Sequence, residues 1–148
     1  MPLAYHITWH TYGSWLPGDD KGWVKRDVPG IQPPDSELRS QVEDQLANER
    51  PLLSEEYREI VERTIREHCL IRSWTLHAVN VRSNHVHIVV SSDRKPEEVM
   101  HQLKSWSSRK LNEQVGAKTR WWAYHGSTKW IVDQAYLANA IRYVLERQ

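Results

Sequence analysis

The feature that most constrains the fold of this chain is the stretch SNHVHIVVSS at residues 83–92, which reads as a β-strand with two unlike faces. Successive side chains of a strand point to opposite faces, so residues two apart emerge side by side. The apolar face consists of Val86, Ile88 and Val90. His85 and His87 project together from the other face, where no apolar packing explains them. The chain must therefore build a sheet with a core on one side and two adjacent imidazoles on the other.

Further periodic segments alternate with this strand. Period-two or β-branched patterns predict strands at residues 4–12 and 73–81 and a strand-like stretch at 119–133, and helical spacing predicts helices at 54–70, 96–112 and 134–148. A short polar turn joins the strand at 73–81 to the histidine strand, so these two should form a hairpin. The order predicts an α+β fold, a ferredoxin-like (RRM-like) antiparallel sheet with helices on one face.

The length of 148 residues predicts a single domain covering residues 1–148. Between residues 13 and 53 the chain holds five of its seven prolines and four of its six glycines. Long connections of this kind are usually functional or disordered. We interpret this segment as an insertion in the domain.

Charge and cysteine content exclude several classes of protein. A net charge of +1 gives no bulk sign of a nucleic-acid binder, so any basic patch must be local. Cys69 is the only cysteine, which excludes an intramolecular disulfide and a multi-cysteine zinc site and predicts a small buried side chain. Neither a signal peptide nor a membrane span is recognisable. We expect a soluble, cytoplasmic protein.

The paired histidines are candidate metal ligands, because neutral imidazole binds Zn, Cu, Fe and Ni well. Two ligands are too few, and Val89 occupies the place where a third alternating histidine would stand. A cupin-type site would require an all-β chain. His6 and His10 share one face of the first predicted strand and could approach the pair, or they could form hydrogen bonds within the sheet. The alternative for the pair is an ordinary polar surface of the sheet.

The last predicted helix carries an apolar stripe made of Leu137, Ile141, Val144 and Leu145. Tyr143 lies on the opposite side with Tyr136 and Asn139, so core packing does not explain it. A phenol with a pKa near ~10 is a weak nucleophile unless that pKa is lowered or its target is polarised. A metal on the two histidines could polarise the target. The alternative is an amphipathic surface tyrosine.

These residues together resemble a known family. The chain contains NHVH at the start of an apolar strand, Leu103-Lys104-Ser105 in a helix, a Trp-rich segment before His125-Gly126-Ser127, and Tyr143 in a terminal helix. This pattern looks like that of the single-tyrosine HUH transposases, which include small insertion-sequence enzymes and the REP-associated tyrosine transposases. The resemblance runs from about residue 73 to residue 148. TYGSWLPGDDKGWV, residues 11–24, is also similar to some REP-associated members.

The resemblance implies a metal-dependent enzyme in which His85 and His87 bind Mg²⁺ or Mn²⁺. Tyr143 would attack single-stranded DNA near a hairpin, giving a 5′-phosphotyrosine link and a free 3′-hydroxyl, so that strands are cleaved and rejoined without ATP. Coordination chemistry taken alone favours a softer metal on two imidazoles. The implied setting is the bacterial cytoplasm, with a substrate in the nucleoid.

One position departs from the family pattern. Many relatives carry Gln or Asn four residues after the tyrosine as a third ligand, and this chain has Arg147 there, which cannot coordinate a cation. The nearest substitutes are Glu146 and Gln148. Of these, Glu146 fits the helical face better.

DNA binding should rest on a local surface, because single strands are held by cationic grooves and by stacking on aromatic rings. The candidates are Lys104, Arg109, Lys110, Arg120, Lys129, Trp15, Trp23, Trp121 and Trp122. For the cations the alternative is a solvated helix face, and for the tryptophans it is core packing.

Two other functions remain open from the sequence. A ferredoxin-like sheet with exposed aromatic rings can bind single-stranded RNA or DNA without catalysis. A replication initiator or relaxase would use the same chemistry, but the small size and the lack of a helicase-like region count against it. The resemblance does not decide whether the protein acts as a monomer or as a homodimer that exchanges tyrosines. It also leaves open which DNA hairpin is recognised and whether the protein still transposes or is domesticated.

Overall fold

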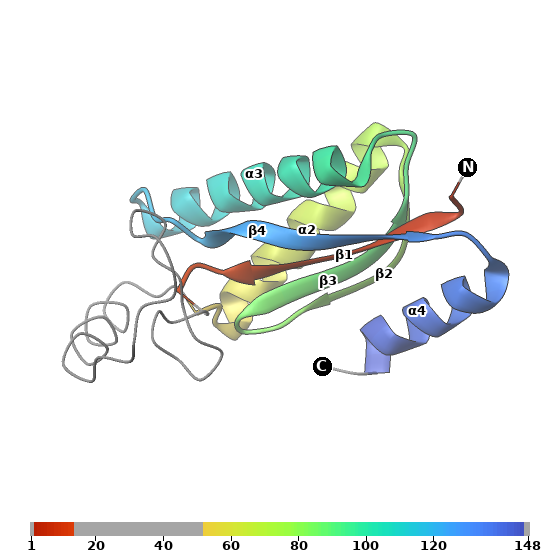
Figure 1. Ribbon diagram of the computed structural model, residues 1–148. Helices are drawn as coiled ribbons and strands as arrows, with labels where there is room; N and C mark the ends of the chain where they lie inside the picture. The colour runs from red at the N-terminus through yellow and green to blue at the C-terminus, as the bar shows by residue number, and fades with distance from the viewer. Residues whose placement is uncertain (1, 14–51, 147–148) are drawn as a thin grey trace, which may run out of the picture.

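Four strands and three helices make up the part of the chain that the structure, a computed structural model, describes, namely residues 2–13 and 52–146 (Figure 1). In chain order the elements are β1 (Ala4–Thr11), α2 (Glu55–Arg72), β2 (Thr75–Val81), β3 (His85–Ser91), α3 (Pro96–Val115), β4 (Trp122–Ile131) and α4 (Gln134–Glu146). The sheet has the order β2-β3-β1-β4, and every neighbouring pair is antiparallel. The fold class predicted from the sequence, α+β with an antiparallel sheet, is confirmed.

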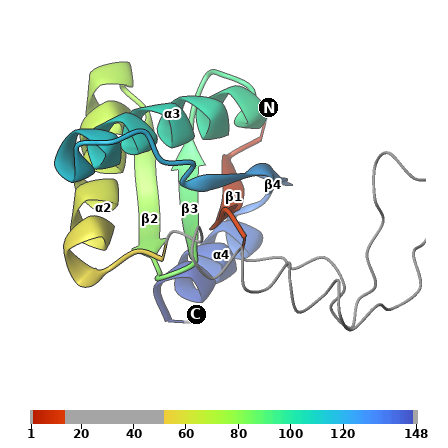
Figure 2. The ribbon, with the colours of Figure 1, turned by 90° about the vertical axis from the view of Figure 1, so that its left-hand side faces the viewer.

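One face of the sheet packs on α2 and α3, which lie together on the same side (Figure 2). Alternate residues of the two central strands enter this core, and all of them are buried. They are Tyr5, Ile7 and Trp9 from β1 and Val86, Ile88 and Val90 from β3. The predicted two-faced character of both strands is confirmed.

The opposite face carries α4, which corrects the expectation that all helices pack on one face (Figure 1). Its buried residues Ala140 and Val144 pack on a second, smaller apolar cluster. The sheet contributes Ala4, Ala78, Val89 and Ile131 to this cluster. Small side chains at two of these positions let the helix lie close to the strands. Because α4 covers only one end of this face, the other end stays open.

The predicted boundaries are correct to within a few residues. The helix expected at 96–112 continues to Val115 and ends at Gly116, whose left-handed φ of 79° suits a glycine. Cys69 is buried as expected. No helix among the described residues is long and apolar enough to cross a membrane. The predicted insertion at residues 13–53 lies almost entirely outside the described residues, so its role stays a prediction.

Trp121 and Trp122 are core residues, so of the two alternatives that the sequence left for them, core packing holds and stacking on DNA does not. Their exposed fractions are 4% and 7%. The indole of Trp121 donates a hydrogen bond to Asn112 Oδ1 at 2.8 Å, and that of Trp122 donates to the Lys104 carbonyl at 3.0 Å. Both indole N–H groups are satisfied inside the protein, which removes the usual cost of burying a tryptophan.

Gly126 of β4 allows α3 to approach the sheet, and its substitution should destabilise the fold. A Cβ at this position would overlap Met100 Sδ and would lie 2.7 Å from the Thr8 carbonyl oxygen. Met100 can move, but the backbone of β1 can move only with the sheet. We expect Gly126→Ala to lower the free energy of unfolding by about 1–3 kcal/mol. Urea titration followed by tryptophan fluorescence measures it.

The control is Ser127→Ala, the next residue along β4, which is exposed. It should change the free energy of unfolding by less than about 0.5 kcal/mol. Equal stability of Gly126→Ala and the wild type would show that the sheet accommodates the methyl group.

Candidate functional site

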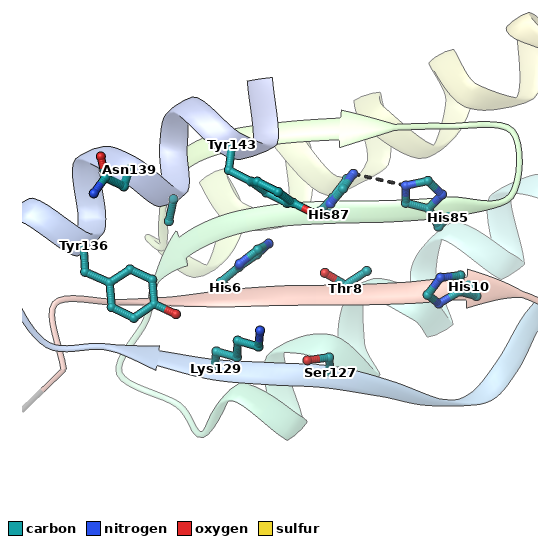
Figure 3. A pocket seen from close by; sticks show the side chains of 11 residues that line it. His6, Thr8, His10, His85, His87, Ser127, Lys129, Tyr136, Asn139 and Tyr143 are labelled. Carbon is teal, nitrogen blue, oxygen red and sulfur yellow. Dashed lines mark hydrogen bonds between the residues drawn. The ribbon is translucent and has the colours of Figure 1, made fainter. Parts of the chain in front are cut away.

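A cavity of about 700 Å³ lies between α4 and the strands that it leaves partly open (Figure 3). The side chains that give it chemical character are His6, His10, His85, His87, Lys129 and Tyr143. No carboxylate is found among the described residues that line it. The ammonium group of Lys129 suits an anionic ligand, whereas the imidazoles are candidate ligands for a metal ion.

The two histidines of β3 form a close pair at this cavity. Their Nε2 atoms are 3.2 Å apart (Figure 3). The Nδ1–H of His85 donates to Asn84 Oδ1 at 2.7 Å, so Nε2 of the neutral ring carries a lone pair, which here accepts the hydrogen bond from His87 Nε2 and could instead bind a metal. Sequence reasoning missed Asn84 as a residue that orients His85, although it directly precedes that histidine in the chain.

Both rings favour the neutral form that a metal ligand needs. Burial, with a smaller contribution from the neighbouring His85, His6, His10 and Arg82, lowers the pKa of His87 to about 4. Burial, followed by His10 and Arg82, also lowers the pKa of His85. Protons therefore compete weakly for the two nitrogen atoms near neutral pH.

The pair fits a metal ion as two ligands. Nitrogen atoms 3.2 Å apart can both reach one cation at bond lengths of about 2.0–2.2 Å. Within residues 2–13 and 52–146, no group of three or more His, Cys, Asp or Glu is arranged to hold a metal. A bound ion would therefore need oxygen ligands from water or substrate.

The proposed substitutes for the third ligand are not brought to the pair. Glu146 is exposed in the last turn of α4 and does not line the cavity, and Gln148 lies outside the described residues. His10 and His6 do approach, with ring centroids 5.5 Å from His85 and 6.3 Å from His87, respectively. The buried Nε2 of His6 has no hydrogen-bond partner among the described residues.

Tyr143 reaches into the same cavity from α4. Its ring centroid is 6.1 Å from that of His87 and 5.9 Å from that of His6. The side chain is 45% exposed, and Figure 3 shows the phenol over β3 with its hydroxyl on the side of His87. The chain thus brings the predicted nucleophile to its own histidines.

Two polar residues outside the predicted set hold α4 in place. Asp133 caps the helix by accepting a hydrogen bond from the Tyr136 amide at 2.7 Å. At the other end, Asn80 Nδ2 donates to the Val144 carbonyl at 2.9 Å, and Asn80 is the β2 partner of His87. The backbone beside Tyr143 is therefore fixed to the strand next to the histidines. An asparagine in mid-strand is the only signal of this that the sequence offers.

The predicted DNA-binding cations do not form one surface. Lys129 lines the cavity, and Arg120 lines an adjoining one. Lys104 instead donates to the carbonyls of Ala123 and Tyr124 at 2.8 and 3.3 Å, and burial lowers its pKa. The others lie on α3, where Arg109 stacks over Trp106 at 4.6 Å and Lys110 is 3.9 Å from Glu113. Trp15 and Trp23 lie outside the described residues.

Comparison with known proteins identifies a matching family and similar solved structures. The family model of IS200-like transposases matches residues 45–144. A solved REP-associated tyrosine transposase bound to a REP hairpin has a similar fold, with a TM-score of 0.55 and 11% identity over 95% of this chain. This chain spans 63% of the length of that protein. The solved structure of a candidate transposase from Deinococcus radiodurans R1 has a TM-score of 0.49 and 14% identity to this chain. The alignment covers 100% of this chain and 92% of that protein. No curated protein sequence matches.

Proposed function

The chain belongs to the IS200-like transposase family, and from this premise we propose that it cleaves and rejoins single-stranded DNA near a hairpin through a covalent link to Tyr143. The observation that carries the proposal is the meeting of three groups in one cavity. The ring centroids of Tyr143 and His87 are 6.1 Å apart, and the Nε2 atoms of His87 and His85 are 3.2 Å apart. A phosphate placed among them would contact the nucleophile and the histidine pair at once.

In the proposed reaction the Oη of Tyr143 attacks the scissile phosphorus. The bond from phosphorus to the 3′ oxygen breaks, the phenol loses its proton, and the leaving 3′ oxygen gains one. The product is a 5′-phosphotyrosine and a free 3′-hydroxyl. Attack by a 3′-hydroxyl of another strand reverses the step and releases the tyrosine, so no external energy source is needed.

His85 and His87 would hold a divalent cation, Mg²⁺ or Mn²⁺, through their Nε2 atoms. Such a cation polarises the phosphate and stabilises the charge that develops during attack. Lys129 lines the same cavity and supplies a positive charge that attracts the DNA backbone. The hydrogen bond from His85 to Asn84 keeps that ring in the required tautomer.

Tyr143 and the histidines meet within one chain, which supports the use of each chain's own tyrosine over an exchange of tyrosines between subunits. Hairpin recognition is inferred from the family and from the solved relative, which is bound to a REP hairpin. The segment at residues 13–53 is the proposed source of additional hairpin contacts.

The test is the formation of a protein–DNA adduct on a denaturing gel. The protein is incubated with a single-stranded hairpin oligonucleotide labelled at its 3′ end, because a 5′-phosphotyrosine retains the 3′ fragment. We expect a labelled protein band with Mn²⁺ or Mg²⁺, and none from the same oligonucleotide labelled at its 5′ end. A protein that only binds DNA would slow the migration of the hairpin in a native gel and would form no adduct.

Metal removal should abolish the reaction. Chelation with EDTA removes the charge that stabilises the attacked phosphate, so adduct formation should fall by at least about 100-fold. Adding excess Mn²⁺ should restore it. An adduct that forms equally well in EDTA would overturn the metal role assigned to the histidines while leaving that of Tyr143 intact.

A further inference from the structure

A second cavity opens beside the catalytic one, where β1 and β4 lose their regular pairing. Trp9 pairs with Gly126 and Thr11 pairs with Trp122, so β1 advances two residues while β4 advances four. The extra residues of β4 bulge out of the ladder. Bulges of this kind often lie next to active sites, where they redirect side chains.

The two cavities adjoin each other. The second has a volume of about 450 Å³ and shares Thr8, His10 and Ser127 with the first; all three are labelled in Figure 3. Its far end is formed by Tyr12 and Arg120, whose guanidinium carbon is 4.4 Å from the centre of the tyrosine ring. A strand bound at Tyr143 can therefore continue into this space.

The bulge is a fixed part of the fold. Its carbonyls at Ala123 and Tyr124 have lost regular partners in β1, and the ammonium of Lys104 binds both of them. Regular backbone contact resumes where the Tyr12 amide donates to the Trp121 carbonyl at 2.8 Å. One side of the cavity is therefore the β4 backbone held by Lys104, and the other side is the Tyr12–Arg120 pair.

The shape and chemistry of this cavity suit a flat, aromatic ligand. Ala123 contributes only a methyl group to its wall, and a guanidinium stacked on a phenol presents a planar cationic surface. Tyr12 lies just beyond the end of β1 and two residues after His10, so their Cα atoms are at most roughly 7 Å apart. This is comparable with the separation of successive phosphates in an extended single strand.

We propose that the second cavity binds a nucleobase adjacent to the scissile phosphate, with Arg120 and Tyr12 as its stacking platform. This inference rests on the proposed function, because that function places the DNA strand in the first cavity. Nucleobase stacking tolerates different sequences, while the walls of the cavity limit the size of the base. Arg120 would then contribute to the choice of cleavage position.

The test measures binding without reaction, in the full chain carrying Tyr143→Phe. The probe is a fluorescein-labelled DNA hairpin with a single-stranded tail on either side, in which each tail base is replaced in turn by an abasic site. Dissociation constants are measured by fluorescence anisotropy for the Tyr143→Phe variant and for the double variant that also carries Arg120→Gln. The matched control is Arg66→Gln, because Arg66 is an exposed arginine on α2, which packs on the opposite face of the sheet.

One abasic position should weaken binding by about tenfold when Arg120 is present and by less than about twofold in Arg120→Gln. Arg66→Gln should keep the tenfold penalty. The proposal is overturned if the penalty persists in Arg120→Gln or if no tail position shows one. It is also overturned if Arg120→Gln weakens every oligonucleotide equally, because a uniform loss marks a phosphate contact.

The adduct assay with Tyr143 intact is run in parallel and separates the two proposals. An adduct without a base-specific effect of Arg120 overturns only the nucleobase site. A base-specific effect without an adduct supports the nucleobase site and overturns the proposed covalent chemistry.

Discussion

Tyr143→Phe is expected to abolish covalent attachment of DNA while leaving hairpin binding unchanged. The substitution removes one oxygen atom, which is the proposed nucleophile, and keeps the ring that packs beside His6 and His87. Adduct formation should fall by more than about 10³-fold, because phenylalanine has no oxygen atom with which to attack the phosphorus. The denaturing gel measures the adduct, and anisotropy measures the affinity.

Tyr136→Phe is the matched control for this experiment. Tyr136 lies two turns earlier on α4, lines the same cavity and is 37% exposed. It should form adduct at the wild-type rate. If Tyr136→Phe lost the adduct and Tyr143→Phe kept it, the assignment of the nucleophile would be reversed.

His85→Ala should show the second large effect, a loss of metal-dependent cleavage. Removing one of two nitrogen ligands leaves too few protein contacts to hold a divalent cation, so Mn²⁺ affinity should fall by at least about tenfold and adduct formation by at least about 100-fold. Isothermal titration calorimetry measures Mn²⁺ binding directly, apart from activity. His85 is only partly buried, so its truncation should leave the fold intact.

His101→Ala provides the control, since His101 is an exposed imidazole on α3. It should bind Mn²⁺ and form adduct like the wild type. Unchanged Mn²⁺ affinity in His85→Ala would show that the histidine pair is not the metal site, whatever happens to the adduct.

The sequence predicted the parts of the site that follow from periodicity. A period of two places His85 and His87 on one face of β3, and a period of 3.6 places Tyr143 away from the apolar stripe of α4. Both patterns are local, so each could be read from a few neighbouring residues.

Features that depend on distant residues were not foreseen. The position of α4 depends on small side chains, such as Ala4 and Ala78, which lie far apart in the chain. Lys104 was predicted to contact DNA because its helix gives no sign that its ammonium group binds the carbonyls of Ala123 and Tyr124 in a distant strand. The bulge leaves those carbonyls without partners in β1. No sequence pattern predicts it, because it arises from a register shift between two strands.

The alternation along β1 has a consequence for how such proteins can diversify. Ile7 and Trp9 are sealed beneath two helices, whereas the intervening Thr8 and His10 border both cavities. Substitutions can therefore alter the residues that border the cavities without disturbing the neighbours that keep the chain folded. The chemistry of the cavities can change on an unchanged scaffold, one alternate residue at a time.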